Sequence, residues 1–304
     1  MPSIDLLLAA PSEPSQLANW GDYHFGRALI AALRRQGANA RMLFRDTQAT
    51  GGSERSLLVL RGKFRPNADW LRSSGYRQRL LWVISWPLDL TPDELQDYDL
   101  ILVASEQDRP RIALLSGRPT VTLPQATAFS SVLPPPADDG RLLFIGNTRG
   151  LERPIVQTFA RSSCPLALIG QGWEQLGLQA EAGSIANHQL PSRYRRALAV
   201  LNDHHGAMRD YGYLNNRIYD ALACGVPVIT DVAPNCPEEL LPAVILHRPG
   251  LDDPADAIAA ARALRRRPDV LTKVATHARR EHSFMARARS IVTHLEFLQR
   301  SDAL

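Results

Sequence analysis

Residues 199–230, AVLNDHHGAMRDYGYLNNRIYDALACGVPVIT, contain the pattern that decides the fold. The apolar run Ala199–Leu201 predicts a strand, and Val226–Thr230 predicts the next one. Between them, Asn216–Cys224 predicts a short helix that stops at a glycine. A strand, a helix and a second strand in this order form a parallel βαβ unit, and ligands bind such sheets at the carboxyl ends of the strands.

Apolar runs alternate with longer amphipathic stretches along the rest of the chain. The other expected strands are Ile4–Ala9, Ala40–Phe44, Leu57–Leu60, Leu80–Ile84, Leu100–Ala104, Thr120–Leu123, Arg141–Ile145 and Leu166–Ile169. The clearest helix is expected from Tyr23 to Gln36, and prolines and acids in Leu133–Gly140 predict a domain boundary. The pattern predicts an α/β chain of two doubly wound, Rossmann-like domains facing across a cleft.

Length, composition and net charge exclude some classes of function and indicate which groups could bind a phosphate. The chain has 304 residues, 45% of them apolar, which is enough for about two domains with buried cores. Its 35 basic and 31 acidic residues leave a net charge of +4, too small for a protein whose main task is to wrap nucleic acid. Only Lys63 and Lys273 are lysines, so arginines, backbone amides and helix ends are expected to hold any bound phosphate.

Cysteines and apolar runs indicate the compartment. Cys164, Cys224 and Cys236 form no C-x-x-C pair, so neither a disulfide framework nor a cysteine zinc site is expected. The N-terminal run Ile4–Ala10 reads as a strand, and no apolar run reaches the roughly 18 residues of a membrane span. We expect a cytoplasmic protein, with at most peripheral contact at the inner face of the membrane.

The start of the helix at Asn216 is the best candidate for a binding site. Asn215 and Asn216 can cap the helix, and its first amides point toward the strand ends. Arg217 in the first turn opposes the helix dipole unless an anion such as a diphosphate lies beside it. Asp220, one turn later, could accept the two hydroxyls of a ribose, and the alternative is an ion pair between Arg217 and Asp220.

Other cofactor motifs are absent or incomplete in the sequence. The nearest match to G-x-G-x-x-G starts at Gly170, but its third glycine is displaced to Gly177, which makes a nicotinamide site a weak hypothesis. No phosphate-binding loop of the G-x-x-x-x-G-K-[ST] type occurs. The D-x-D triplet Asp97–Asp99 precedes a strand and reads as a solvated turn, so no metal is expected.

Residues 216–229, NRIYDALACGVPVI, resemble the signature of the group 1 glycosyltransferases of GT-B fold, in the branch similar to the spore-maturation protein CgeB. NWGDYH at 19–24, LWVIS at 81–85, VASE at 103–106 and LFIGNTRG at 143–150 extend the resemblance. It implies a C-terminal domain that binds a nucleotide sugar, an acceptor held against the N-terminal domain, and a last helix that crosses back. We therefore expect domains at 1–136 and 137–285 and a returning helix at 286–304.

The resemblance also implies roles for single residues. Asp220 stands where the group has the second Glu of its Glu, seven residues, Glu motif, which holds the donor ribose, whereas Gly212 stands at the first. Gly146, Asn147 and Arg149 match the glycine-rich loop that faces the diphosphate, and Arg149 and Arg217 would supply its two positive charges. Further donor-binding residues are expected at Trp173, His204, Tyr213, Asn215 and Asn216. Trp173 either stacks on the nucleobase or belongs to the core, and His204 and His205 either bind the donor or simply line the cleft.

Asp22 and His24 are the candidate catalytic bases because Gly21–His24 follows the first strand at the start of a helix. The alternative role of Asp22 is the helix N-cap. The predicted function is transfer of a sugar from a nucleotide sugar to a glycan, lipid-linked sugar or protein, in surface polysaccharide or glycoconjugate synthesis, without metal or cofactor. Two other functions stay open: an epimerase or hydrolase of nucleotide sugars on the same fold, and a non-catalytic protein that binds them.

Overall fold

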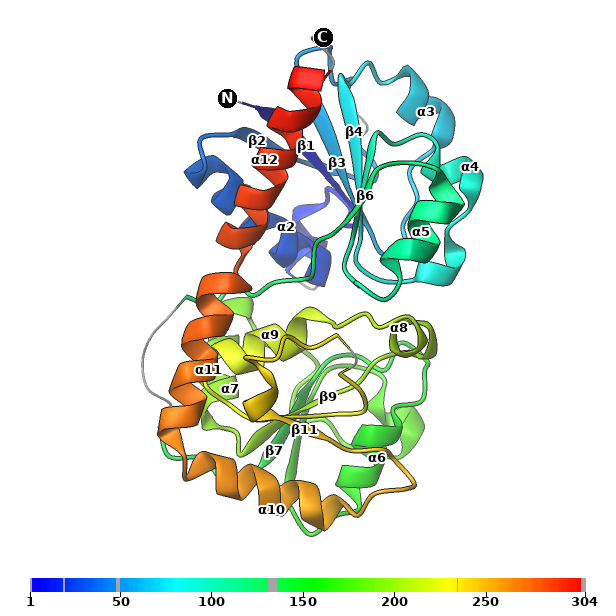
Figure 1. Ribbon diagram of the computed structural model, residues 1–304. Helices are drawn as coiled ribbons and strands as arrows, with labels where there is room; N and C mark the ends of the chain where they lie inside the picture. Colours follow the sequence, from blue (N-terminus) through cyan, green and yellow to red (C-terminus); the bar gives the residue numbers. More distant parts are fainter. Residues whose placement is uncertain (1, 19, 48–49, 131–135, 234, 302–304) are drawn as a thin grey trace. The chain divides into compact units, whose positions relative to one another are not determined.

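The computed structural model describes residues 2–18, 20–47, 50–130, 136–233 and 235–301 (Figure 1). The chain forms two compact units. Unit 1 comprises Met1–Ala128, Gly206–Asn215 and His282–Leu304, and unit 2 comprises Phe129–His205 and Asn216–Glu281. These bounds differ from the expected 1–136 and 137–285, chiefly because Gly206–Asn215 belongs to unit 1. Residues 131–135 of the predicted boundary lie outside the described residues.

Unit 1 is built on six parallel strands in the order β2-β1-β3-β4-β5-β6. The strands are β1 (Ser3–Leu8), β2 (Asn39–Phe44), β3 (Ser56–Arg61), β4 (Gln78–Val83), β5 (Leu100–Val103) and β6 (Thr120–Thr122). The helices are α1 (Pro14–Leu17), α2 (Gly21–Arg35), α3 (Ala68–Ser73), α4 (Pro92–Leu95), α5 (Arg109–Ser116), α8 (Gly206–Asp210) and α12 (Phe284–Ser301), with the 3₁₀ turn η1 (Pro87–Asp89).

Both faces of this sheet are covered, which explains why its central strands contain continuous apolar runs, Leu57–Leu60 in β3 and Leu80–Val83 in β4. Leu58 and Leu60 of β3 belong to a core shared with α2 and α12, whereas Leu57 and Val59 belong to a second core on the other face. That second core includes side chains of α3, α4 and α5. Burying apolar side chains on two faces is the main stabilising contribution in a sheet of this kind.

The last helix packs within unit 1. The chain rejoins this unit at His282, whose carbonyl oxygen accepts a hydrogen bond from the amide of Thr127 at 2.8 Å. Arg287 of α12 then donates from Nε to Pro124 O at 2.7 Å and from Nη2 to Gln125 O at 3.1 Å. Side chains of α2 and α12 share one hydrophobic core, so the end of the chain is tied to the beginning of the unit.

The segment Gly206–Asn215 also belongs to unit 1. Met208 and Tyr213 are buried in its second core, and Tyr213 Oη donates to Asp108 Oδ2 at 2.8 Å. The Tyr213 side chain is only 1% exposed. Its predicted role in donor binding is therefore wrong, because its ring and hydroxyl are enclosed in the core of unit 1.

Unit 2 has five parallel strands in the order β11-β10-β9-β7-β8. The strands are β7 (Leu142–Ile145), β8 (Leu166–Ile169), β9 (Ala199–Asn202), β10 (Val228–Thr230) and β11 (Val244–Leu246). The helices are α6 (Pro154–Ala160), α7 (Leu190–Arg196), α9 (Asn216–Ala223), α10 (Pro254–Arg265) and α11 (Pro268–Glu281), with the 3₁₀ turns η2 (Trp173–Leu176), η3 (Asn187–Gln189) and η4 (Leu241–Ala243). All ten strands expected from the sequence are present, and β11 is additional.

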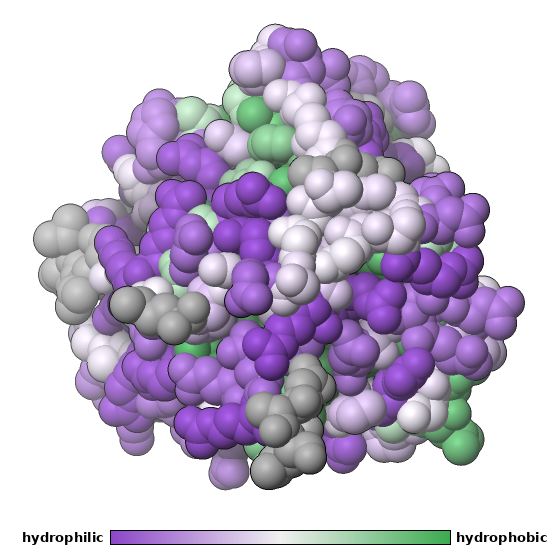
Figure 2. Space-filling view, turned by 90° about the horizontal axis from the view of Figure 1, so that it is seen from above, coloured by the Kyte–Doolittle hydropathy of each residue, from purple (hydrophilic) through white to green (hydrophobic). Residues whose placement is uncertain are grey.

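Within the described ranges, no helix is both long and apolar enough to cross a bilayer. The 18-residue helix α12, for example, carries three arginines, Arg287, Arg289 and Arg300. Figure 2 shows the face of the molecule that is seen from above, where hydrophilic residues predominate and hydrophobic residues form only small areas.

Candidate functional site

Four loops meet at the carboxyl edge of the unit 2 sheet. They follow β7 at Gly146–Gly150, β8 at Gly170–Gly172, β9 at Asp203–His205 and β10 at Asp231. The four strands are direct neighbours in the order β10-β9-β7-β8, and all are parallel, so their ends lie along one edge. Helix α9 starts at Asn216 and leads into β10, as a βαβ unit requires.

The loops after β7 and β8 approach each other through glycine backbone. Gly146 N donates to Ile169 O at 2.8 Å, and Asn147 Oδ1 accepts from Gln171 N at 2.8 Å. Gly170 has a φ of +142°, which favours glycine, and a Cβ there would collide with the Gly146 carbonyl group. Asn147 therefore joins two loops, and its side-chain carbonyl oxygen is already engaged by the protein.

Arg217 projects from α9 to the ends of two strands. Its Nε donates to Ile145 O at 3.1 Å, and its Nη1 donates to Asn202 Oδ1 at 3.2 Å and to Asp203 Oδ1 at 3.3 Å. The guanidinium carbon lies 4.3 Å from the centre of the Phe144 ring. The Arg217 bonds go to these groups rather than to Asp220, so the ion-pair alternative is wrong. Burial lowers the pKa of Arg217, but an arginine with an Asp203 partner stays charged.

Asp203 lies between two arginines, one of which sequence reasoning missed. Its Oδ2 accepts from Arg153 Nη1 at 2.8 Å, while its Oδ1 faces Arg217. Arg153 also donates from Nη2 to Asn147 O at 3.0 Å. Arg153 directly precedes helix α6, so the reasoning that singled out Arg217, an arginine beside a helix start and a glycine loop, could have found it.

Arg149 adds a further positive charge to this edge. It is exposed in the loop after β7 and has a φ of +55°, uncommon for a side chain other than glycine. Burial lowers the pKa of His205, and the positive charges of Arg153 and Arg149 act in the same direction. The edge therefore combines several guanidinium groups with an imidazole that favours its neutral form, an environment suited to an anion.

Asn216 and Asp220 lie on one side of α9. Asn216 is exposed at the start of the helix, and its Nδ2 donates to Asp220 Oδ2 at 3.3 Å. Asp220 is buried and follows one turn later. Asn215 immediately precedes this helix and is half-buried. The structure thus places Asn216, Arg217 and Asp220 within the first five residues of α9, whereas Asn215 is the last residue of the segment that belongs to unit 1.

Two predicted donor contacts are wrong because the side chains are fully enclosed. Trp173 is 0% exposed; its Nε1 donates to Gly146 O at 3.1 Å, and its ring meets Phe144 edge to face with centroids 5.4 Å apart. It therefore cannot stack on a nucleobase and is the core tryptophan of the alternative interpretation. The His204 side chain is also 0% exposed, with Nδ1 2.8 Å from Asp231 Oδ1, so it cannot touch a donor.

The two candidate bases lie in unit 1, in the first turn of α2. The N-cap of α2 is Trp20, without a side-chain capping bond, so the N-cap alternative for Asp22 is wrong. Asp22 in the first turn is favourable for the helix dipole. His24 Nε2 lies 2.9 Å from Ala18 O, a pair that requires a proton on Nε2 and leaves the lone pair of neutral His24 on Nδ1. Asn19 lies outside the described residues.

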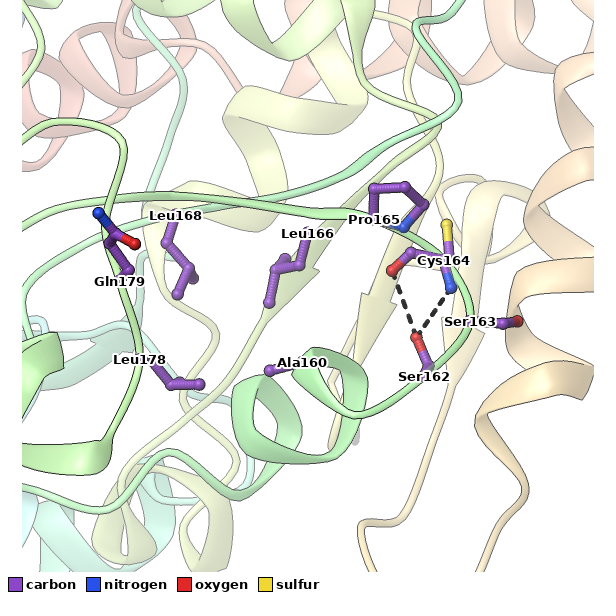
Figure 3. Close-up of a pocket in the computed structure, with 9 residues that line it drawn as sticks. All are labelled: Ala160, Ser162, Ser163, Cys164, Pro165, Leu166, Leu168, Leu178 and Gln179. Atoms are coloured by element: carbon purple, nitrogen blue, oxygen red, sulfur yellow. Dashed lines mark hydrogen bonds between the residues drawn. The ribbon is translucent and has the colours of Figure 1, made fainter.

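A pocket of about 300 Å³ lies elsewhere on unit 2 (Figure 3). It is lined by Ala160 at the end of α6, by Ser162 after that helix, by Cys164 and Leu166 where β8 begins, and by neighbouring side chains. Ser162 Oγ accepts from Cys164 N at 3.3 Å and lies 3.5 Å from Cys164 O. Because this pocket is at the amino end of β8, it contains none of the predicted site residues.

Comparisons with known proteins support the fold and a family likeness. Residues 149–293, a little under half of the chain, match a family model described as "Glycosyl transferase-like". No curated protein sequence matches this chain. Helix α9 and the Asp203–His205 loop lie inside the matched range, and so do Arg149 and Arg153.

Several solved structures resemble the whole chain. Sucrose-phosphate synthase from Thermosynechococcus elongatus shares 14% identity at a TM-score of 0.66, covering 99% of this chain and 100% of that chain. AviGT4, a glycosyltransferase involved in avilamycin A biosynthesis, shares 14% identity at a TM-score of 0.66, covering 98% of each. Anabaena HepE in complex with UDP-glucose shares 10% identity at a TM-score of 0.63, covering 97% and 99%. Likenesses at these identities establish the fold, and the predicted α/β class with two Rossmann-like domains of GT-B type is confirmed.

Proposed function

We propose that this protein is a glycosyltransferase whose nucleotide-sugar donor binds at the carboxyl edge of the unit 2 sheet. The observation that carries the proposal is the placement of Arg217, a guanidinium fixed by Ile145 O, Asn202 and Asp203 beside the glycine loop and at the start of a helix. The match of residues 149–293 to a glycosyl transferase-like family supports it, as does the UDP-glucose bound by the structurally similar HepE.

In this proposal the diphosphate is held by cations and by helix α9. Arg217, Arg153 and Arg149 supply positive charge, and Asn216 with the first amides of α9 supplies hydrogen-bond donors. Glycosyl transfer releases a nucleoside diphosphate, so charge that develops on the leaving group is stabilised by groups already in position. Arginines then take the role that a metal ion has in other transferases, and we propose a reaction without metal or cofactor.

Asp220 is proposed to accept hydrogen bonds from the ribose hydroxyls. Its carboxylate is buried one turn into α9, and Asn216 Nδ2 holds one of its oxygens at 3.3 Å. A carboxylate accepts two hydroxyls readily because it has about four lone-pair sites. Glycine has no side-chain acceptor, so Gly212, where the resembling group has a glutamate, cannot supply the contact to the donor sugar that a glutamate makes there.

The acceptor is proposed to meet unit 1 near α2. His24 Nδ1 or the Asp22 carboxylate would take the acceptor proton if the reaction inverts the configuration. We propose a glycan, a lipid-linked sugar or a protein as the acceptor, in the synthesis of surface polysaccharide or glycoconjugates. The site of action would be the cytoplasm, at most in peripheral contact with the inner face of the membrane, and the CgeB-like branch stays a prediction from the sequence motifs.

A panel of nucleotide sugars and nucleoside diphosphates tests the proposal. Selective binding raises the apparent melting temperature, and calorimetry then gives the affinity of the best ligand. That donor is next incubated alone and with a set of acceptors, and the products are separated. Sugar transfer supports the proposal. Free sugar or an epimer from donor alone would indicate a hydrolase or epimerase, and binding without turnover on any acceptor would indicate a binding protein.

A further inference from the structure

Four buried polar side chains form a network at the ends of β9 and β10, and the proposed function uses only Asn202 among them. They are Asn202, His204, Thr230 and Asp231, and each is at least nine-tenths enclosed. Buried polar groups are retained at a cost unless they are hydrogen-bonded, and here every one of them has a partner in the network. The network meets the proposed donor site at the bond from Arg217 Nη1 to Asn202 Oδ1.

The bond to Arg217 fixes the orientation of the Asn202 amide. A guanidinium has only donors, so the group that faces Nη1 at 3.2 Å must be the amide oxygen and not the amide nitrogen. The amide nitrogen then faces the opposite way. It donates to Thr230 Oγ1 at 3.1 Å and lies 3.4 Å from His204 Nε2.

The orientation of the amide in turn shows which tautomer of His204 is present. Nε2 can accept from Asn202 only without a proton, so neutral His204 carries its proton on Nδ1. Nδ1 lies 2.8 Å from Asp231 Oδ1, and Asp231 Oδ2 accepts the amide of His204 at 3.0 Å. Burial by itself would raise the pKa of Asp231, but the hydrogen bonds from His204 outweigh it and hold the pKa below its ordinary value. Asp231 is therefore a carboxylate, which accepts the Nδ1 proton.

We propose that His204 and Asp231 are positioning residues for Arg217, acting through the Asn202 amide. Asp231 sets the tautomer of His204, His204 Nε2 sets the direction of the Asn202 amide, and the amide oxygen holds Arg217 Nη1. This inference rests on the proposed function, because it assigns the network to the binding of the donor diphosphate.

The alternative arrangement shows why the direction matters. If Nε2 carried the proton, the Asn202 amide would turn its oxygen to His204 and its nitrogen to Arg217. Two N–H groups would then face each other, and Arg217 would lose the contact to Asn202 and keep only its bonds to Ile145 O and Asp203. A displaced guanidinium loses the geometry that a diphosphate requires.

Two substitutions of His204 separate its two bonds. In His204→Asn the amide nitrogen can replace Nδ1 and keep the bond to Asp231, but nothing replaces Nε2. In His204→Gln the longer side chain can bring a carbonyl oxygen to the place of Nε2. With UDP as the calorimetric probe, His204→Asn is expected to weaken binding roughly tenfold or more, the effect of one misplaced charge-assisted hydrogen bond, and His204→Gln to recover most of it.

A double-mutant cycle tests whether the effect passes through Asn202. In the Asn202→Ala background no amide is left to orient, so His204→Asn and His204→Gln are expected to bind UDP equally. Circular dichroism and thermal melting establish that each variant is folded. Unchanged UDP affinity in folded His204→Asn, or the same loss in the Asn202→Ala background, would overturn the proposal.

Nuclear magnetic resonance provides a test without any ligand. The ¹⁵N shifts of the His204 ring are expected to show the Nδ1-protonated tautomer, and the Arg217 Nε–H signal should move in His204→Asn and stay in place in His204→Gln. A proton on His204 Nε2, or an Arg217 Nε–H signal that stays in place in both variants, refutes the inference. Failure of UDP and every other nucleoside diphosphate to bind the unmodified protein would instead refute the proposed function, and the resonance data would still decide the role of His204.

Discussion

The backbone of Gly170 lies directly against the carbonyl group of Gly146: a Cβ on Gly170 would be 2.5 Å from the Gly146 carbonyl carbon. The φ of Gly170 is +142°, a region that L side chains rarely adopt. Gly170→Ala is therefore expected to lower the free energy of unfolding by about 2–5 kcal/mol, from backbone strain and overpacking together. Urea denaturation followed by circular dichroism measures the loss.

Gly177 provides a matched control for this substitution. Its φ is also positive, at +68°, but a Cβ there would meet no atom within 4 Å. Gly177→Ala should cost only the strain of the left-handed conformation, about 1–2 kcal/mol. An equal loss in both variants would show that contact between the two glycine loops contributes nothing.

Substitution of Arg217 should weaken nucleotide binding. Arg217→Ala is expected to reduce the binding free energy of a nucleoside diphosphate by about 1.5–3 kcal/mol, the loss of a charge-assisted hydrogen bond. Arg217→Lys should recover little of it, because an ammonium group cannot donate to Ile145 O and Asp203 in the same forked geometry. Isothermal titration calorimetry gives both affinities.

Arg248→Ala is the control for loss of one positive charge. The Arg248 side chain is 68% exposed and pairs with Asp252 through Nη2 and Oδ1 at 2.7 Å. Its removal should leave nucleotide affinity unchanged, since exposed ion pairs contribute little and screening by salt limits long-range effects. If Arg217→Ala bound the nucleotide as tightly as this control, the assignment of Arg217 would be wrong.

Tyr213 should affect stability and not nucleotide affinity. Tyr213→Phe removes the bond from the hydroxyl to Asp108 Oδ2, but Arg111 still donates to Asp108 at 2.6 and 3.0 Å. We expect a loss of about 1–2 kcal/mol in the free energy of unfolding. In Tyr211→Phe, the control, Arg111 keeps its stacking contact with the ring, and stability should change by less than about 0.5 kcal/mol. Weaker nucleotide binding in Tyr213→Phe would contradict its place in the core of unit 1.

The fold was predictable because parallel strands with two buried faces are continuous apolar runs, as in β3 and β4. Strand β11 was missed because Val244–Leu246, although apolar, is only three residues long, shorter than the roughly 4–8 residues of an ordinary strand run. The return of Gly206–Asn215 to unit 1 depends on how Met208 and Tyr213 pack, which no local pattern expresses.

The candidate site was predictable where it follows from strand ends. Arg217, Gly146 and Asn216 lie at the carboxyl edge because a βαβ unit puts them there. The position of the Arg153 guanidinium depends on its ion pair with Asp203, which is 50 residues away in the sequence. The burial of Trp173 depends on the turn before it and on the hydrogen bond from its indole to Gly146 O. Contacts of this kind are decided by tertiary packing, so the sequence identified the edge and misassigned some of its side chains.

The buried carboxylate of Asp5 is expected to make the free energy of unfolding depend on pH. Its carboxylate is 0% exposed in β1 and accepts from Arg41 Nε at 2.7 Å, Arg55 Nε at 2.7 Å and Tyr76 Oη at 2.8 Å. Burial by itself would raise the pKa of Asp5, but these hydrogen bonds outweigh it and lower the pKa below its ordinary 3.8. Because the pKa is lower in the folded than in the unfolded protein, the stabilisation is complete well above pH 3.8 and is lost as the pH falls through the lowered value.

Asp5→Asn is therefore expected to cost about 2–4 kcal/mol at neutral pH, somewhat less than for a wholly buried pair because Arg41 is half exposed. The difference in unfolding free energy between the variant and the unmodified protein should shrink as the pH is lowered from about 6 to about 2, since the native carboxyl then becomes neutral too. Urea denaturation at several pH values measures it. Asp69→Asn, whose carboxylate is 93% exposed, should show almost no difference at any pH. If the difference in unfolding free energy between Asp5→Asn and the unmodified protein stayed constant with pH, hydrogen-bond geometry, and not the charge of Asp5, would stabilise this part of the sheet.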